Sequence, residues 1–564
     1  MAHEIGRGES TVPRRSMPLP DPFYYLNNFR TVISSLEQRY AKLLCPEERE
    51  FIAHFGALPQ ASCALLVRMV MRARVFFRGS RLRYSEIGEI SSAAAPLVEA
   101  GWIDECPVLD VDQLQRLLTK AELLHYFGLP RQYLKFKKPD LVACLRTQHP
   151  ASKPFSAWCK ESSECVYRLN VAPLCERFRL MFFGNFHQDW TEFVLTDLGL
   201  FTYEKVPAPL HSLAFRTRAH VDAFQQLHRG REWLDAGTEL DEVRAAIPPP
   251  IIDCDWLEDC RQKMLYQTAR AYEQRGDMNT ASAMYLQCTH RDARVRRIRL
   301  LERAHQCEEA RELCLAAQRD PLNEAERQQI QRLLPRLDRK LGISSNKKSG
   351  RPAVSAFEML LDRPAAEYAI EHVVRDRLAQ QAEMHSTVHY VENGLVNSLF
   401  GLLCWKAIFA AIPGAFFHDF QYGPADLSSG HFFQRRSGEF AECFAELDSD
   451  RYRETIWRNF AVKSAVQSPF VTWGLLNEKL LGWALRCLPA AHLRLWFEWI
   501  VRDVRMNRAG FPDLVQFWPH ERRYRMVEVK GPGDRLQDNQ RRLLEFCASH
   551  QMPVSVCYVR WRPD

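Results

Sequence analysis

The chain has 564 residues, more than one ordinary domain holds, and this length predicts three or four domains. Its 46% hydrophobic and 26% charged residues are typical of a globular protein. A net charge of +7 excludes a uniformly basic nucleic-acid binder, so any surface that binds nucleic acid has to come from local clusters of basic residues. The 17 cysteines show no zinc-binding spacing, so we expect reduced thiols and no zinc site. Neither a signal peptide nor a long apolar run is present, so we expect no membrane span. The expected location is cytoplasmic, or nuclear in a eukaryote.

The first 57 residues are expected to form a leader followed by helices. Residues 1–20 are rich in Gly, Pro and Arg, a composition typical of a disordered basic segment. Apolar residues then recur at helical spacing from Tyr24 to about Phe55.

Residues 58–149 contain two patterns typical of DNA-binding modules. In the first, a helix is followed by a strand-like run, Val75–Phe77, and by a helix that ends near Gly101, which together indicate a small helical or winged-helix unit. Arginines alternate here with aromatic residues, a mixture that suits phosphate contact with some stacking. A solvated basic face is an equally good interpretation. The candidate DNA-binding residues of this unit are Arg78, Arg81 and Arg83.

The second pattern is a pair of short helices around a turn, 111–118 and 119–124, with a further helix downstream. Thr119 and Glu122 have the spacing of a capping box. The run TKAELLHYFGLP, followed by KFKKPDLVACLR, resembles a SAP motif, a helix–extended–helix module that binds DNA. The side chains expected to face phosphates are Lys135, Lys137 and Lys138.

Residues 150–352 are expected to form a mostly helical domain. The segment 194–199 is predicted to be a strand, and three consecutive prolines at 248–250 mark a boundary. The following helices have the spacing of a tetratricopeptide repeat, in which small residues allow two helices to pack closely. The residues that carry this spacing are Tyr266, Ala269, Tyr272, Gly276, Ala281 and Tyr285.

An arginine-rich helix lies between the first repeat-like pair and a looser second copy. A solvated face is the default interpretation of such a run. Arg296 and Arg299 share one face of this helix and are therefore also candidates for contact with the DNA backbone. The stretch 341–351 is predicted to be a linker.

The last domain is expected to span residues 353–564. A long amphipathic helix is predicted over 365–384, and an otherwise apolar helix over 391–403 begins with Glu392. A carboxylate at the start of a helix is usually a cap or a partner of the helix dipole. From the residues alone, this is the interpretation that we favour for Glu392.

Two short strands are predicted near the C-terminus, around 510–515 and 526–531, with a polar turn between them. Side chains two apart in a strand share a face, so Glu528 and Lys530 should project together while Val529 turns into the core. A closed hairpin would bring Asp513 beside them.

This trio has the chemistry of a metal site. Two neighbouring carboxylates repel each other unless a cation lies between them, and Mg²⁺ and Mn²⁺ prefer hard oxygen ligands. The carbonyl of Val529 could be a third oxygen ligand beside the two carboxylates. Such a metal polarises a phosphoryl oxygen and lowers the pKa of a bound water, while Lys530 could stabilise the developing charge. The alternative is an ordinary charged hairpin with an exposed Asp and a Glu–Lys pair.

Three sequence runs together resemble the Fanconi-associated nuclease family: HYVENGLVNSLFGLLCWKAIF, then FQYGPADL, then NRAGFPDLVQF with RMVEVKGPGDRLQDNQRRLLEF. The catalytic unit of this family is the virus-type replication-repair nuclease (VRR-NUC) domain, a branch of the PD-(D/E)xK nucleases. The resemblance implies a multidomain, mostly α protein with a C-terminal α/β nuclease domain. It also implies that Glu392, Asp513 and Glu528 bind metal, that Lys530 is the catalytic lysine, and that Gln540 is the glutamine of the helix after the core strands.

The resemblance further implies a function. Family members are structure-specific DNA nucleases that cut near 5′ flaps and trim from 5′ to 3′ in interstrand crosslink repair. The ubiquitin-binding zinc finger of eukaryotic members is absent from this sequence, which points to a bacterial member. We expect a branched or 5′-flap DNA substrate, no small-molecule cofactor, and a monomer on DNA.

Two alternatives remain at this stage. Small stand-alone VRR-NUC proteins resemble Holliday-junction resolvases, which act as dimers, whereas the long one-sided arms of this chain favour a monomer on an asymmetric flap. A non-catalytic DNA-repair scaffold is the other alternative. The intact set of three acids and a lysine argues against it.

Overall fold

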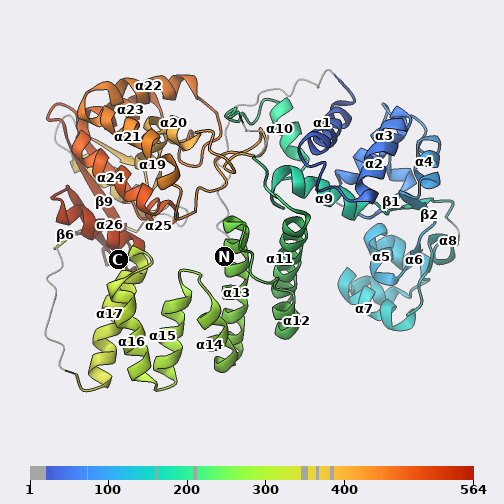
Figure 1. The fold of residues 1–564 in the computed structure, drawn as a ribbon, viewed down its shortest axis with the longest axis horizontal. Helices are drawn as coiled ribbons and strands as arrows, with labels where there is room; N and C mark the ends of the chain where they lie inside the picture. The colour runs from blue at the N-terminus through green and yellow to red at the C-terminus, as the bar shows by residue number, and fades with distance from the viewer. Residues whose placement is uncertain are drawn as a thin grey trace. The chain divides into compact units, whose positions relative to one another are not determined.

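The computed structural model describes residues 21–563, except residues 73 and 161 and the segments 208–211, 344–352, 364–367 and 382–385. The fold is multidomain and mostly helical, with an α/β region at the C-terminal end, as the sequence predicts (Figure 1). None of the described helices is long and apolar enough to cross a membrane. The expected leader and most of the expected linker lie outside the described residues.

The chain divides into two compact units. Among the described residues, the N-terminal unit comprises 21–201 and 212–221, and the C-terminal unit comprises 202–207 and 222–563. The domain boundaries expected after residues 57, 149 and 352 stay predictions.

The first half of the N-terminal unit combines helices with a small antiparallel sheet. The strand-like run at 75–77 is confirmed as β1, and the helix expected to end near Gly101 is α4. The three-stranded sheet has the order β1-β5-β2, so its central strand comes from a distant part of the chain. The elements are α1 (Tyr24–Arg39), α2 (Pro46–Ala57), α3 (Gln60–Val70), β1 (Phe76–Arg78), η1 (Gly79–Arg81), α4 (Ile90–Glu99), β2 (Ile103–Glu105) and β5 (Val166–Leu169).

The helix pair of the SAP-like region is also confirmed. Thr119 accepts the N–H of Glu122, and the Glu122 carboxylate accepts the N–H of Thr119 at 2.7 Å, which is the capping box expected from the sequence. The elements are β3 (Val108–Leu109), α5 (Val111–Leu117), α6 (Lys120–Tyr126), η2 (Arg131–Lys135), α7 (Lys138–Gln148), β4 (Lys153–Pro154) and α8 (Phe155–Trp158).

The strand predicted over 194–199 is wrong, because this segment belongs to a helix. After α9 (Ala172–Phe183), α10 spans Thr191–Asp197. Asp189 precedes it and accepts the N–H of Thr191 at 2.8 Å, and Gly199 follows it with a φ of 65°. This start signal and this stop signal outweigh the apolar, β-branched residues on which the strand prediction rests.

The repeat-like region forms a row of helices that pack against their neighbours in the sequence. Ala269 and Ala281 are fully buried where α13 and α14 meet, and Gly276 ends α13 with a φ of 91°. The packing that the small residues predict is confirmed, and the assignment to the tetratricopeptide class stays a prediction. The helices are α11 (Arg218–Ala236), α12 (Leu240–Ala245), α13 (Asp255–Arg275), α14 (Met278–Gln287), α15 (Ala293–Arg303), α16 (Cys307–Arg319) and α17 (Glu324–Lys340).

The C-terminal α/β region is built on a five-stranded sheet with the order β6-β10-β9-β8-β7. The predicted hairpin is β8 and β9, paired antiparallel with Leu514 opposite Val527, while β10 lies parallel to both β9 and β6. The strands are β6 (Ser355–Leu361), β7 (Thr387–Tyr390), β8 (Leu514–Trp518), β9 (Arg523–Lys530) and β10 (Val554–Trp561).

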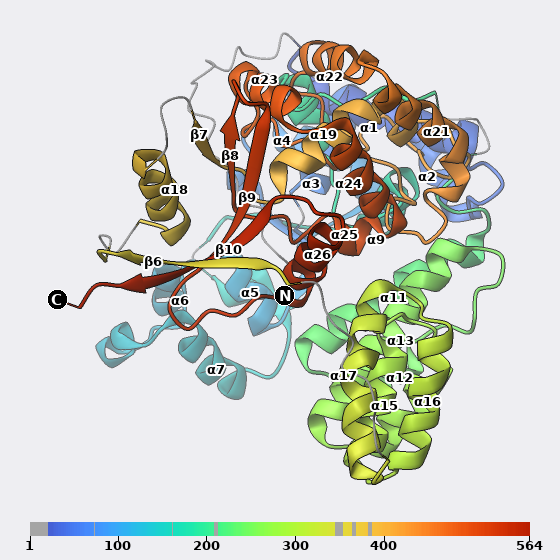
Figure 2. The same cartoon turned by 90° about the vertical axis from the view of Figure 1, so that its left-hand side faces the viewer.

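Helices cover both faces of this sheet, as Figure 2 shows for α18 on one side and α24 and α26 on the other. The helix predicted over 365–384 is shorter in the described residues, where it spans Ile370–Gln381. The helices are α18 (Ile370–Gln381), α19 (Gly394–Leu403), α20 (Trp405–Ile408), α21 (Ser437–Ala445), α22 (Arg451–Val462), α23 (Glu478–Cys487), α24 (Ala490–Arg502), α25 (Val504–Asn507) and α26 (Asp538–Ser549), with short 3-10 turns at Gln434–Arg436 and Glu446–Asp448.

Candidate active site

The hairpin places Asp513, Glu528 and Lys530 together, as predicted. The Nζ atom of Lys530 lies 2.8 Å from Oε1 of Glu528, and the N–H of Val529 donates to Oδ2 of Asp513 at 2.8 Å. Val529 turns its side chain into the core under α18. All three polar side chains are buried, with Glu528 only 1% exposed. An ordinary solvated hairpin is therefore excluded.

Burial makes the two hairpin carboxyls hard to ionise. Burial and the nearby charge of Asp513 raise the pKa of Glu528 to about 7, although Lys530 opposes the shift. Burial also raises the pKa of Asp513 to about 6, against the bond from Val529 and the charge of Lys530. An acidic site of this kind gains stability when a cation enters it.

The start of α19 fixes the position of Asp513. The backbone N–H groups of Val391 and Glu392 donate to the carbonyl of Asp513 at 2.8 and 3.1 Å. The Oδ1 atom of Asn393 accepts the N–H groups of Gly510 and Phe511 at 2.7 and 3.0 Å. The loop before β8 is therefore anchored to the N-terminus of α19.

Gly510 is required by this arrangement. Its φ is 101°, and a Cβ atom there would lie 2.9 Å from the carbonyl carbon of Asn539 at the start of α26. The loop that carries Asp513 thus packs directly against the backbone of α26.

Glu392 is not the cap of α19, so that part of the interpretation favoured from the residues alone is wrong. Asn393 occupies the N-cap position, and Glu392 precedes it. The Glu392 side chain is exposed, and it accepts hydrogen bonds from the hydroxyl of Tyr390 and from Nδ2 of Asn393. Its charge nevertheless acts on both Asp513 and Glu528. Its role as a metal ligand stays a prediction.

The donor set fits a hard divalent cation. Apart from the ion pair with Lys530, neither carboxylate oxygen of Glu528 has a hydrogen-bond partner among the described residues, which is costly for a buried charge. In the conformation described, no group of three or more His, Cys, Asp or Glu side chains in residues 21–563 outside the gaps converges as a finished metal site. The Glu392 carboxylate instead accepts the hydroxyl of Tyr390.

Gln540 has a structural partner. Its Oε1 atom accepts the N–H of Gln537 at 2.9 Å and forms a capping box at the start of α26. The catalytic role that the family resemblance implies for Gln540 stays a prediction.

The predicted DNA-binding residues of the N-terminal unit differ in whether their side chains are open to a phosphate. Arg78 is paired with Glu122 and Glu164 and is largely buried, so it joins the sheet to the SAP-like helices and is not open to a phosphate. Arg81 and Arg83 are exposed. Their contact with DNA stays a prediction.

The three lysines of the SAP-like region also differ. Lys135 and Lys137 are exposed, whereas Nζ of Lys138 donates to the carbonyls of Gln115 and Leu118 at 2.6 and 2.8 Å. Lys138 therefore caps the end of α5.

The two candidates in the repeat-like region are partly buried and already bonded. Arg296 lies 3.5 Å from Glu273, and Arg299 donates to Gln329 at 3.0 Å. A purely solvated face is thereby excluded for both, and contact with DNA stays a prediction.

A cluster of cations in the C-terminal unit was missed from the sequence. Lys263 on α13 has a lowered pKa because of burial and the charges of Arg505 and Arg231, and Arg505 on α25 has a lowered pKa because of burial and the charge of Arg291. Lys263 and Arg505 have no ion-pair partner among the described residues, and Arg291 lies 3.7 Å from Asp503. We call Lys263, Arg291 and Arg505 the cation cluster.

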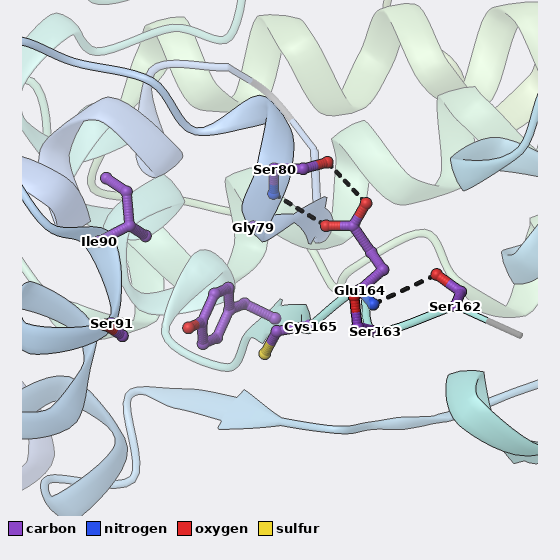
Figure 3. A pocket seen from close by; sticks show the side chains of 9 residues that line it. Gly79, Ser80, Ile90, Ser91, Ser162, Ser163, Glu164 and Cys165 are labelled. Atoms are coloured by element: carbon purple, nitrogen blue, oxygen red, sulfur yellow. Dashed lines mark hydrogen bonds between the residues drawn. The ribbon is translucent and has the colours of Figure 1, made fainter.

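A hollow of about 360 Å³ lies in the N-terminal unit (Figure 3). Glu164 crosses it and accepts the N–H and the hydroxyl of Ser80 at 2.8 and 2.6 Å, so its carboxylate holds two segments together. The hollow is lined by Gly79, Ser80, Ile90, Ser91, Ser162, Ser163, Glu164, Cys165 and Tyr167.

Comparison with known protein families identifies three regions. The model of the VRR-NUC domain matches residues 447–561, that of the FAN1 HTH domain matches 23–104, and that of the Fanconi anemia-associated nuclease SAP domain matches 108–158. The VRR-NUC match contains both strands of the hairpin.

Two curated proteins show the extent of the similarity. The chain is 48% identical over 556 residues to the Fanconi-associated nuclease 1 homolog of Pseudomonas aeruginosa, with 99% of each chain covered. It is 23% identical over 609 residues to a homolog from Oryza sativa subsp. japonica, covering 96% of this chain and 63% of the relative.

Two solved structures are similar over nearly the whole chain. One is the crystal structure of paFAN1 bound to 2-nucleotide 5′-flap DNA with a gap, with a TM-score of 0.93 and 49% identity. The similarity covers 97% of this chain and 100% of the paFAN1 chain. The complex with a 1-nucleotide 5′ flap has a TM-score of 0.90 at the same identity, with 96% and 100% covered.

Proposed function

We propose, from the premise that this chain belongs to the Fanconi-associated nuclease 1 family, that it is a structure-specific DNA nuclease that cuts 5′-flap DNA. The observation that carries the proposal is the buried set of Asp513, Glu528 and Lys530 on the hairpin of a VRR-NUC domain. We further propose that the enzyme trims from 5′ to 3′ and acts in interstrand crosslink repair.

The nuclease depends on a divalent metal, and we propose Asp513, Glu528, Glu392 and the Val529 carbonyl as its ligands. A divalent cation held there would polarise the scissile phosphate and make a water more acidic. The buried carboxylates support this role, because Glu528 has few other partners for its charge. We propose Mg²⁺ or Mn²⁺, since both prefer carboxylate and carbonyl oxygens.

Lys530 would stabilise negative charge as it develops on the phosphate. Its ammonium lies 2.8 Å from Glu528 and is held in a buried position by the end of β9. A cation that is already oriented in a poorly solvated site does not have to reorganise during the reaction. Gln540, at the start of α26 beside the Asp513 loop, would help to orient the reacting groups.

The cation cluster supports recognition of a DNA backbone in the same unit. Cations that repel one another at partly buried positions gain stability when a phosphate enters between them. Lys263 and Arg505 are such cations, since neighbouring positive charges contribute to the lowered pKa of each. We propose that this cluster binds a phosphate of the flap substrate.

A panel of DNA substrates tests the function. The chain, supplied with Mn²⁺ or Mg²⁺, is incubated with 5′-labelled 5′-flap, 3′-flap, nicked, single-stranded and four-way DNA. We expect the fastest cleavage on the 5′ flap, at one arm of the junction. Paired symmetric cuts in four-way DNA would favour a Holliday-junction resolvase instead. Absence of cleavage on every substrate would favour a binding scaffold.

A further inference from the structure

Two neighbouring helices of the repeat-like region carry a row of cations each. On α15 three arginines have the spacing i, i+3 and i+7, so they share one face of the helix. On α17 three cations are four residues apart and also share a face. The two rows adjoin, because Arg299 on α15 donates to Gln329 on α17 at 3.0 Å. We call these six residues the basic face, and they are Arg296, Arg299, Arg303, Arg332, Arg336 and Lys340.

Two buried carboxylates hold the cations of the basic face in place. Glu273 on α13 is 8% exposed and lies 3.5 Å from Arg296 and 3.3 Å from Arg303. Glu302 on α15 is 6% exposed and pairs with two cations of α17, at 2.8 Å for the lysine. Each carboxylate is shared by two cations and is itself shielded from solvent. The solvent side of this face is therefore positively charged.

Arg299 lies between Arg296 and Arg303 on α15 and has no carboxylate of its own. Among the described residues it forms no ion pair, and it donates to the amide oxygen of Gln329. Burial and the charges of Arg296 and Arg336 lower the pKa of Arg299. A guanidinium has five N–H donors, so this bond leaves donors for a ligand. A cation among other cations gains stability when an anion enters between them.

The charge balance of the basic face favours an anionic ligand. Its six cations pair with only three carboxylates, which are the two buried ones and Asp538, 2.7 Å from Arg332. The face therefore has an excess of positive charge. The side chains of Arg303 and Arg336 are 61% and 48% exposed, so their guanidinium groups are open to a ligand from solvent.

The dimensions of the basic face match a nucleic-acid backbone. Its cations span residues 296–303 on α15 and 332–340 on α17, which at 1.5 Å per residue is about 10 and 12 Å. Phosphates of one DNA strand follow each other every ~3.4 Å along the duplex axis, so each row can follow about three of them. Asp538, the partner of Arg332, begins α26, against which the Asp513 loop packs. The basic face thus borders an element of the candidate active site.

We propose that the basic face binds the phosphate backbone of a duplex arm of the flap substrate, outside the cleavage site. The proposal rests on the proposed action on 5′-flap DNA and adds a second phosphate-binding surface to the cation cluster. Guanidinium and ammonium groups contact phosphate oxygens and not base edges, so the face would hold an arm of any sequence. A solvated face is the default interpretation from the sequence, because the carboxylate that orders Arg296 and Arg303 comes from another helix.

Binding of labelled 5′-flap DNA to the full chain without metal tests the proposal, because no metal-dependent cleavage interferes. The test variant carries Arg299→Ala, Arg303→Gln and Arg336→Gln. Each buried carboxylate of the face keeps one cation in this variant, Arg296 for one and Lys340 for the other, so the fold is not left with an unpaired buried charge.

The matched control also removes three positive charges, but from other surfaces of the repeat-like region. It carries Arg275→Gln, Arg319→Gln and Arg327→Gln, whose arginines are all exposed. Arg275 and Arg327 pair with exposed carboxylates, so their loss leaves no buried charge unpaired.

Fluorescence polarisation at several salt concentrations measures affinity. The test variant should bind flap DNA about 10-fold or more weakly, and the slope of log affinity against log salt should fall by up to about 3. Arg299→Ala alone, which takes a cation from no carboxylate, should lower the slope by about 1. The control should bind like wild type. Substrates with one duplex arm shortened, tested for each arm in turn, should include one to which wild type and the test variant bind alike.

The outcomes separate this proposal from the nuclease function. Unchanged affinity and salt slope in the test variant, or an equal loss in the control, overturns the proposal. Unchanged DNA binding with lost binding of a labelled polyglutamate peptide would assign the face to an acidic protein segment instead. Wild type that binds flap DNA but does not cut it in Mn²⁺ would remove the nuclease function and leave the basic face standing. Wild type that does not bind flap DNA would overturn both.

Discussion

Glu392 shows how one residue can have two opposite interpretations in the sequence. A carboxylate at the start of an apolar helix is typical of a cap, yet Asn393 takes that position, and its Oδ1 atom binds the loop before β8. Glu392 instead presents its backbone N–H to the carbonyl of Asp513. The Glu392 side chain therefore does not cap the helix, and its negative charge raises the pKa of both Asp513 and Glu528.

Glu392→Gln should separate stability from chemistry. No helix N–H depends on this side chain, and glutamine can still accept the bond from Tyr390, so unfolding free energy should change by less than about 0.5 kcal/mol. Loss of the negative charge should slow cleavage of flap DNA by roughly 100-fold or more. Rates at saturating Mn²⁺ and thermal melting are measured in parallel. Cleavage within a few-fold of wild type would remove Glu392 from the ligand set.

At the scale of elements, the SAP-like helices show which lysines hold the fold and which face solvent. Lys138 donates to two carbonyls at the end of α5, whereas Lys135 and Lys137 are exposed on the segment before α7. The sequence presents all three as one basic run. Only the packing of α7 against α5 distinguishes them.

A Lys135→Ala and Lys137→Ala double variant should bind flap DNA more weakly, and the slope of log affinity against log salt should fall by up to about 2, because each phosphate contact contributes close to one unit. Lys138→Ala should instead lower stability by about 1–3 kcal/mol through the loss of its charged hydrogen bonds. Binding titrations at several salt concentrations and denaturant unfolding measure the two effects. An unchanged salt slope in the double variant would place these lysines away from DNA.

The stability of the contact between the small sheet and the SAP-like helices should depend on pH. Burial opposes ionisation of Glu122, but the N–H of Thr119 and the guanidinium of Arg78 prevail and lower its pKa to about 2. Because the folded-state pKa lies below the unfolded one, the stabilisation is complete above about pH 5 and is lost as pH falls towards 2.

Glu122→Gln should therefore reduce the free energy of unfolding by about 1–2 kcal/mol at pH 7, after allowance for partial solvent screening. The difference from wild type should shrink steadily below pH 4.5. Denaturant unfolding of the full chain at a series of pH values measures it. A difference that stays constant with pH would show that the ion pair with Arg78 contributes little.

Several elements could be predicted from the sequence because their signals are local. The hairpin, the capping box of Thr119 and the small-residue packing of α13 and α14 all follow from spacing within a few residues. The prediction of a strand in place of the helix Thr191–Asp197 is wrong because the signals for the start and the end of the helix, Asp189 and Gly199, lie just outside the apolar run. The central strand β5 could not be placed, since its partners β1 and β2 are far away in the sequence.

At the scale of the whole molecule, the features that were missed come from residues distant in the sequence. The cation cluster contains one residue from α13, one from the turn before α15 and one from α25, and no run of basic residues in the sequence predicts it. Such sites become visible only when the fold brings separate helices together.

Lys263→Ala and Arg505→Ala should each weaken binding of 5′-flap DNA by about 10-fold, because a phosphate loses a partly buried cation. Neither variant should be less stable without DNA, since the remaining cations then repel one another less. Arg297→Ala is the matched control, because Arg297 is paired with Glu309 on neighbouring helices. Fluorescence polarisation measures affinity, and an equal loss in the control variant would contradict a specific phosphate site.

The central claim is that metal-dependent cleavage of flap DNA takes place at the hairpin acids. It is tested most directly by measuring cleavage and binding of one labelled 5′-flap substrate by wild type, Asp513→Asn and Glu528→Gln in Mg²⁺ and in Mn²⁺. The account predicts cleavage slower by at least about 100-fold in both variants, with affinity for the flap within a few-fold of wild type. Near-normal cleavage by either variant in either metal would contradict it.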